Sequence, residues 1–192
     1  MMLGRSHRRR AIACAAVLAS ALIARGPVTA APSQTATPKA DVIWIPSNDA
    51  EVTAMLTMAK VTKSDVVYDL GCGDGRILIA AAKRFGARGV GIEIDPGLVK
   101  QARAAVTKAG VGDKVTIIEG NLFDPAIKIG DATVVTLFLL ESLNQRLRET
   151  RLQTELKPGT RIVSNAFTMG QRWPPEQSES VGNTTIYMWT VR

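Results

Sequence analysis

The sequence predicts an α/β protein with a doubly wound, mostly parallel sheet. Three observations lead to this prediction. Short apolar runs rich in β-branched residues alternate with segments of helical periodicity. A glycine-rich loop directly follows one of these runs, where open α/β sheets bind ligands. No long helical segment separates the last two runs, which indicates an antiparallel terminal strand.

The expected elements follow one another along the chain. An extended segment at 41–47 precedes a helix that Ser47 or Asn48 caps and that runs to Met58. Further helices are expected at 76–85, 96–110 and 142–156, and Gly110 ends the second of these. Strands are expected at 66–70, 88–94, 114–120, 132–140, 160–167 and 184–191. The run at 132–140 is apolar throughout, as in a strand covered on both faces.

The amino-terminal segment has the pattern of a secretory signal. Arginines at positions 5, 8, 9 and 10 precede the apolar run 11–24, and small residues lead to a cleavage site before Ala31. We expect a signal peptide or membrane-targeting segment at 1–30, a linker at 31–40 and one domain at 41–192. The segment implies export to the periplasm or membrane association, whether it is cleaved or stays as an anchor.

Composition excludes several classes of site. Cleavage would remove five of the 24 basic residues, leaving 19 against 17 acidic ones, a net charge of +2. No clustered basic face is visible, so we expect no nucleic-acid partner, and we interpret the arginine-rich segment 146–151 as a solvated helix face. His7 is the only histidine, and Cys72 is the only cysteine of the domain. Histidine-based triads and His- or Cys-ligated metal sites are therefore not expected.

The glycine loop at 69–75 reads D-x-G-x-G-x-G. A dinucleotide fingerprint would place its third glycine at position 76, where Arg76 stands, and no phosphate-binding loop of the G-x-x-x-x-G-K type is present. Asp69 is also unfavourable beside a phosphate because like charges repel. An acid before the glycines favours a ligand that carries an ammonium group, such as S-adenosylmethionine.

Each part of such a ligand has a candidate partner. Asp69 would pair with the amino group, the glycines would let the backbone approach, and the start of the following helix would face the carboxylate. Glu93 ends the second expected strand and would accept both ribose hydroxyl groups. Asn121 follows the third strand and would accept from the adenine amino group. The predicted cofactor site comprises Asp69, Gly71, Cys72, Gly73, Gly75, Glu93, Ile94, Asn121 and Leu122.

Some of these residues also have simpler interpretations. Cys72 is better explained as a small residue in a tight loop than as a nucleophile. Asp74 and Asp95 are each interpreted as caps of the helices that follow them.

The segment 69–75, Glu93 and the pair Asn121-Leu122 resemble the first three motifs of class I S-adenosylmethionine-dependent methyltransferases. The resemblance covers about residues 41–192 and implies a Rossmann-like sheet of seven strands. That family often has Asp where this chain has Asn121. The segments WIPSNDAEVTAML, YDLGCGDGRI, GIEIDP, TLFLL and LKPGTRIVS are similar to small bacterial relatives of the lysine methyltransferases that act on the ATP synthase c subunit. This similarity implies protein-lysine N-methylation, with a membrane-protein lysine as the acceptor.

The acceptor is expected near the end of the fourth strand, at Thr136 and Phe138. The segment TLFL lacks the Asn-Pro-Pro-Tyr of many amide and base-amine methyltransferases. Phe138 would form a wall of a lysine channel and Trp44 would cover the cofactor, unless both are ordinary core residues. No catalytic base is identified.

Two other functions stay open. One is a non-catalytic module of the cell envelope that only binds S-adenosylmethionine. The other is a nicotinamide-dependent oxidoreductase, which Arg76 disfavours. An export signal also conflicts with the supply of this cofactor, which is made in the cytosol.

Overall fold

The computed structural model describes residues 45–192 of the chain. The chain divides into two units, Met1–Ala36 and Thr37–Arg192. The predicted signal and linker, Trp44 and most of the extended segment 41–47 lie outside the described residues. Within the described part, no helix is long and apolar enough to cross a membrane.

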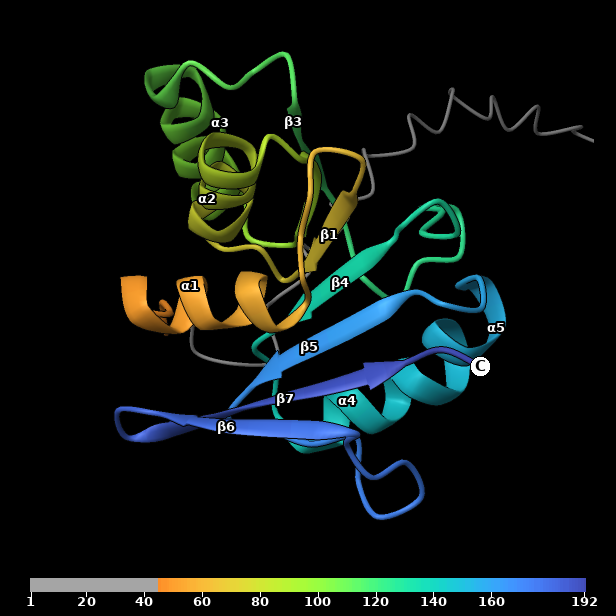
Figure 1. Cartoon of the computed structure of the whole chain (residues 1–192). Helices are drawn as coiled ribbons and strands as arrows, with labels where there is room; N and C mark the ends of the chain where they lie inside the picture. The colour runs from red at the N-terminus through yellow and green to blue at the C-terminus, as the bar shows by residue number, and fades with distance from the viewer. Residues whose placement is uncertain (1–44) are drawn as a thin grey trace, which may run out of the picture. The chain divides into compact units, whose positions relative to one another are not determined.

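A sheet of seven strands runs through the second unit (Figure 1). Its strands are β1 (Val66–Leu70), β2 (Arg88–Glu93), β3 (Val115–Glu119), β4 (Val134–Leu137), β5 (Arg161–Asn165), β6 (Gln177–Val181) and β7 (Thr184–Thr190). Their order is β3-β2-β1-β4-β5-β7-β6. The five strands from β3 to β5 are parallel, and β7 pairs antiparallel with both β5 and β6. The predicted fold class and the antiparallel terminal strand are therefore confirmed.

The helices lie in two layers. They are α1 (Asp49–Met58), α2 (Arg76–Phe85), α3 (Pro96–Ala109), α4 (Glu141–Leu147), the π-helix η1 (Arg148–Leu152) and α5 (Gln153–Glu155). Asn48 caps α1 in a capping box with Glu51, and Asp95 caps α3, both as the sequence indicates. The helix predicted at 142–156 is a continuous helical run whose middle part is the π-helix.

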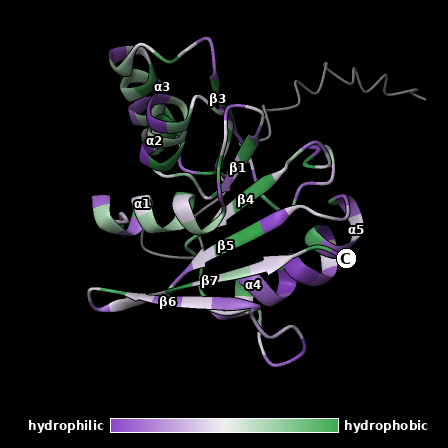
Figure 2. Ribbon diagram, in the orientation of Figure 1, coloured by the Kyte–Doolittle hydropathy of each residue, from purple (hydrophilic) through white to green (hydrophobic). Residues whose placement is uncertain are grey.

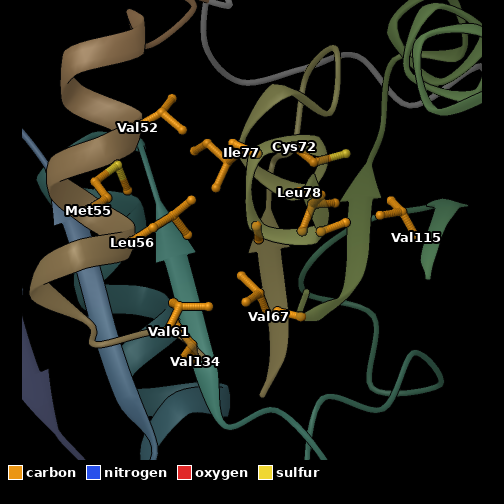
Figure 3. Close-up of a cluster of buried hydrophobic side chains, with 14 of the residues drawn as sticks. Val52, Met55, Leu56, Val61, Val67, Cys72, Ile77, Leu78, Val115 and Val134 are labelled. Carbon is orange, nitrogen blue, oxygen red and sulfur yellow. The ribbon is translucent and has the colours of Figure 1, made fainter. Parts of the chain in front are cut away.

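Successive residues of the strands alternate between two hydrophobic cores. Helices α1, α2 and α3 cover one face of the sheet, where Leu56 and Leu78 pack with Val67 and Val134 (Figure 3). The run from α4 to α5 covers the other face, where Leu147 contributes to the core together with Val66, Val135 and Trp189. Both faces of the central strands are thus buried, which explains their continuously apolar sequences.

The structure differs most from the sequence prediction at two strands, and the other strand ends differ by no more than two residues. Strand β6 is not among the strands expected from the sequence. It is an exposed edge strand that pairs only with β7, and it therefore has no apolar run (Figure 2). Strand β4 ends at Leu137 rather than at Leu140, because the next residues leave the sheet. Phe138 contacts the ring of Phe167, and Leu139 packs beneath the glycine loop.

Candidate active site

The glycine loop joins β1 to α2 at the carboxyl end of the sheet, beside the point between β1 and β4 where the strand order reverses. Gly71, Gly73 and Gly75 have φ angles of 87°, 53° and 78°, a region that side chains rarely adopt. The N–H groups of Gly71 and Cys72 both donate to the carbonyl of Ile92, at 2.8 and 3.1 Å. The loop is therefore tied to the end of β2 and presents a fixed backbone surface.

Cys72 turns its side chain away from this surface into the core. A Cβ atom on Gly91 would lie 2.6 Å from Cys72 Sγ, so the thiol fills the space that this glycine leaves on β2 (Figure 3). Burial raises the pKa of the thiol, and the nearby carboxylates of Asp69 and Glu93 raise it further. Cys72 is thus a packing residue that contributes only its backbone to the surface of the glycine loop. Its thiol stays protonated and is therefore not a nucleophile.

Asp69 is a buried carboxyl group at the end of β1, only 3% exposed. The hydroxyl of Thr136, in the neighbouring β4, donates to Asp69 Oδ1 at 2.8 Å. Burial raises the pKa of Asp69, the Thr136 hydrogen bond lowers it, and the charges of Glu93 and Asp74 raise it again, to about 7 in total. A positive group bound here would stabilise the ionised form.

Glu93 is buried at the end of β2 and organises the loops around it. Its Oε2 accepts from the Gly73 N–H at 2.9 Å, while Oε1 accepts from the N–H groups of Ile94 and Asp95 at 2.8 and 2.9 Å. The carboxylate thus connects the glycine loop with the start of α3. Each oxygen can accept more than one hydrogen bond, so the group retains capacity for a hydroxyl ligand.

Asp74 completes the acidic cluster at the loop. It does not provide the N-cap of α2, which is Gly75, but its Oδ1 accepts from the Arg76 N–H at 3.2 Å. Burial opposes ionisation of Asp74, but hydrogen bonds and charge from Arg76 outweigh it and lower the pKa of this carboxyl group. The Arg76 guanidinium also donates to the carbonyl of Ser47 at 2.8 Å, which links the glycine loop to the start of α1.

The loop after β3 lies next to the same carboxylates. Gly120 N–H donates to the Glu93 carbonyl at 2.8 Å, which places Asn121 and Leu122 beyond the end of β2. The Asn121 side chain is exposed, and its Oδ1 accepts from the Phe123 N–H at 2.9 Å. The structure therefore brings the predicted cofactor residues of all three loops to one edge of the sheet.

The residues expected at the acceptor site lie in different environments. Thr136 is fully buried and its hydroxyl faces Asp69, so it lies beneath the candidate site. Phe138 is only partly buried, and its ring centroid lies 6.4 Å from that of Phe167, which follows β5. These two rings stand at the carboxyl end of the sheet, whereas Trp44 lies outside the described residues.

The interpretation of 146–151 as a solvated helix face is wrong for two of its three arginines. Arg148 and Arg151 are buried, and their guanidinium groups donate to backbone carbonyls of the loops around the site. Only Arg146 is exposed, and it stacks 3.8 Å from the centre of the Phe123 ring. Sequence reasoning missed these residues because an arginine-rich helical segment is usually solvated.

The donor set of the site fits S-adenosylmethionine. Three carboxyl groups gather around a glycine loop, and burial together with the charges of Glu93 and Asp74 raises the pKa of Asp69. A ligand with ammonium and sulfonium groups would supply positive charge there, whereas a phosphate would add negative charge. Within residues 45–192, no three His, Cys, Asp or Glu side chains are grouped so that they could hold a metal ion.

Comparison with known proteins identifies the family. The ANTKMT methyltransferase domain matches residues 69–177. A protein-lysine N-methyltransferase of Saccharolobus islandicus is 43% identical over 155 residues, covering 78% of this chain and 94% of the relative. The adenine nucleotide translocase lysine N-methyltransferase of Mus musculus is 31% identical over 150 residues, covering 78% of this chain and 63% of the relative.

A solved structure is similar over the same region. The RNA methyltransferase from Salinibacter ruber, in complex with S-adenosyl-L-homocysteine, is 50% identical with a TM-score of 0.74, covering 77% of this chain and 94% of that one. These findings favour a methyltransferase over a nicotinamide-dependent oxidoreductase or a non-catalytic module. The chain belongs to the ANTKMT methyltransferase domain family and is a class I methyltransferase that depends on S-adenosylmethionine.

Proposed function

We propose that the chain transfers a methyl group from S-adenosylmethionine to the side-chain amine of a protein lysine. The observation that carries this proposal is the similarity to the Saccharolobus islandicus enzyme, which extends over 94% of that relative. The partly buried Phe138 and Phe167 beside the acidic cluster support it. Two aromatic rings at this position would suit the apolar stem of a lysine side chain.

The cofactor supplies an electrophilic methyl group on a sulfonium. Asp69 would bind its amino group, and the backbone of the glycine loop would hold its methionyl part. Glu93 accepts from the ribose hydroxyl groups while it keeps its bonds to the Gly73 and Ile94 N–H groups. Ile94, Asn121 and Leu122 would hold the adenine. These assignments follow from the chemistry of each side chain at this edge of the sheet.

The acceptor lysine enters between the loops that follow β4 and β5. Its amine must lose a proton before it attacks, since an unperturbed lysine has a pKa of about 10.4. Phe138 and Phe167 exclude water there and disfavour the charged ammonium form. Once that proton has passed to water, the neutral nitrogen would take the methyl group, and S-adenosylhomocysteine would leave as the carbon–sulfur bond breaks. The chain positions and desolvates the reactants.

The amino-terminal segment supports a membrane-associated acceptor. The apolar run at 11–24 would hold the domain at a membrane surface, where lysines of membrane proteins are accessible. The proposal requires that the domain stays on the cytosolic side, where S-adenosylmethionine is made. The Mus musculus relative is named as a methyltransferase of lysine in the adenine nucleotide translocase. Fractionation of cells that express the full chain or residues 31–192 tests this proposal, which fails if both remain in the soluble fraction.

The acceptor class is tested with radioactive S-adenosylmethionine. The full chain is incubated separately with membrane proteins of Saccharolobus islandicus and with total RNA of the same cells. Acid hydrolysis of the protein should yield radioactive methyl-lysine, and Asp69→Asn should remove it. Label found only in nucleosides would refute the lysine proposal and favour RNA, the substrate class named for the Salinibacter ruber enzyme.

A further inference from the structure

The helical run α4–η1–α5 directs polar side chains at two separate loops of the site. One is the loop at 120–128, which contains Asn121 and Leu122 of the predicted cofactor site. The other is the loop at 166–170, which contains Phe167 of the proposed acceptor channel. We call them the cofactor loop and the acceptor loop.

Arg151 holds the cofactor loop through backbone carbonyls. Its side chain is 2% exposed. The guanidinium Nη1 donates to the carbonyls of Leu122 and Asp124, at 2.7 and 3.1 Å, and Nη2 donates to the carbonyl of Ile127. Glu155 accepts from the Nε and Nη2 groups at 2.7 and 2.9 Å, which fixes the plane of the guanidinium. A planar group with five donors is suited to such a set of acceptors.

Asn144 and Arg148 hold the acceptor loop in the same way. The buried Asn144 donates from Nδ2 to the carbonyls of Phe167 and Thr168, both at 3.3 Å. Arg148 donates from Nη1 to the carbonyl of Met169 at 2.7 Å. Ala166 begins this loop with a φ of 65°, a strained conformation for a residue with a side chain. Such a conformation persists only where its surroundings fix it.

The two sets of contacts meet in η1. Arg148 and Arg151 are its first and fourth residues, and each donates to a different loop. Short π-helical turns are rare and occur frequently at functional sites. Neither guanidinium is within the acidic cluster that would bind the cofactor, so both act through the loops.

We propose that Arg151 is a positioning residue for the cofactor loop and that Arg148, with Asn144, positions the acceptor loop. The inference rests on the proposed function for the roles of the two loops. Its consequence is a separation of effects: Arg151 controls cofactor affinity, whereas Arg148 controls use of the acceptor. A merely structural role would weaken both together.

Calorimetric titration of the full chain with S-adenosylhomocysteine tests the first half. Arg151→Met should raise Kd roughly tenfold, the loss expected from about one hydrogen bond of net binding free energy. Arg151→Lys, which keeps a charge beside Glu155, should recover part of the affinity and serves if the methionine variant does not fold. Arg148→Met should leave Kd within about twofold. The control is Arg84→Met, which removes an exposed ion pair to Asp49.

Hydrogen exchange and kinetics test the second half. Arg148→Met should speed amide exchange in 166–170 and raise KM for the lysine acceptor, without changing exchange in 120–128. Arg151→Met should speed amide exchange in 120–128, without changing exchange in 166–170 or the KM for the lysine acceptor. Equal losses of cofactor affinity in both variants, or an unchanged Kd in a folded Arg151→Met, would overturn the inference. If the unsubstituted chain does not bind S-adenosylhomocysteine, the proposed function fails, and the exchange pattern still decides whether each arginine orders its own loop.

Discussion

Cofactor affinity should depend on pH near neutrality because of Asp69. The carboxyl group is buried beside Glu93 and Asp74, and its pKa is raised to about 7. Only the ionised form can pair with the amino group of the cofactor. Binding must therefore remove the proton from Asp69, and acid should weaken it.

The magnitude follows from the ionised fraction. A group with a pKa of 7 is roughly one-tenth ionised at pH 6.0 and roughly three-quarters ionised at pH 7.5. The Kd for S-adenosylhomocysteine should consequently be about eightfold higher at pH 6.0 than at pH 7.5. A free α-amino group, with a pKa of about 7.7 to 8.0, remains mostly protonated over this range.

The same pKa affects stability of the ligand-free chain, with a definite sign. Because the folded pKa lies above the unfolded value, stability is fully present below about pH 4 and falls as the pH rises through about 7. The loss amounts to at most roughly 4 kcal/mol for a shift of this size. Bound cofactor should recover part of it by pairing with the carboxylate.

Calorimetry in two buffers of different ionisation enthalpy measures both the affinity and the protons released. Close to one proton should leave at pH 6.0 and fewer at pH 7.5. Asp69→Asn should bind weakly and without this pH dependence. A Kd that stays constant between the two values, or a slope that survives in Asp69→Asn, would refute the assignment of Asp69.

Four further substitutions test the surroundings of the site. Thr136→Val removes the hydroxyl that lowers the pKa of Asp69, so the midpoint of the pH profile should rise and affinity at pH 7 should fall by about threefold to tenfold in the same titration. Gly91→Ala would place a Cβ atom 2.6 Å from Cys72 Sγ and should cost about 1–3 kcal/mol in urea unfolding; Cys72→Ala should restore part of this loss, and full additivity of the two changes would count against the contact. Ala166→Gly should relieve the φ of 65° and stabilise the chain by about 1 kcal/mol in thermal unfolding, and an unchanged or lower Tm would show that no strain is stored there.

Most of the fold could be predicted because its elements carry local signals. Helix α2 and strand β1 have the predicted bounds, since their apolar periodicity and flanking glycines mark them. Strand β6 carries no such signal because its QSESV sequence is exposed and its pairing depends on β7. The sequence prediction extends β4 to Leu140, beyond its end at Leu137. Phe138 and Leu139 are apolar because they make tertiary contacts outside the sheet.

Those parts of the candidate site that have local sequence motifs could also be predicted. Asp69, Glu93 and the glycines occupy short motifs at strand ends, so the sequence places them and the sheet brings them together. The carbonyls that Arg151 contacts lie 24 to 29 residues earlier in the chain. Every residue has a backbone carbonyl, so the sequence does not show which of them accept these hydrogen bonds. Nothing local distinguishes a buried arginine of this kind from a solvated one. Contacts between side chains and distant loops therefore require the structure.

The two acids at the ends of β1 and β2 are alike in sequence but differ in their physical situation. Glu93 accepts three backbone N–H groups, so the folded chain itself compensates its burial. Asp69 accepts a hydrogen bond from the Thr136 hydroxyl, but burial and the charges of Glu93 and Asp74 raise the pKa of this carboxyl group. A carboxylate that accepts several backbone N–H groups stabilises the loops that donate to it. A buried carboxylate with a raised pKa is stabilised in its ionised form by a cationic ligand. This difference supports the proposal that Glu93 both orders the loops and binds the ribose, and that Asp69 selects a positively charged cofactor.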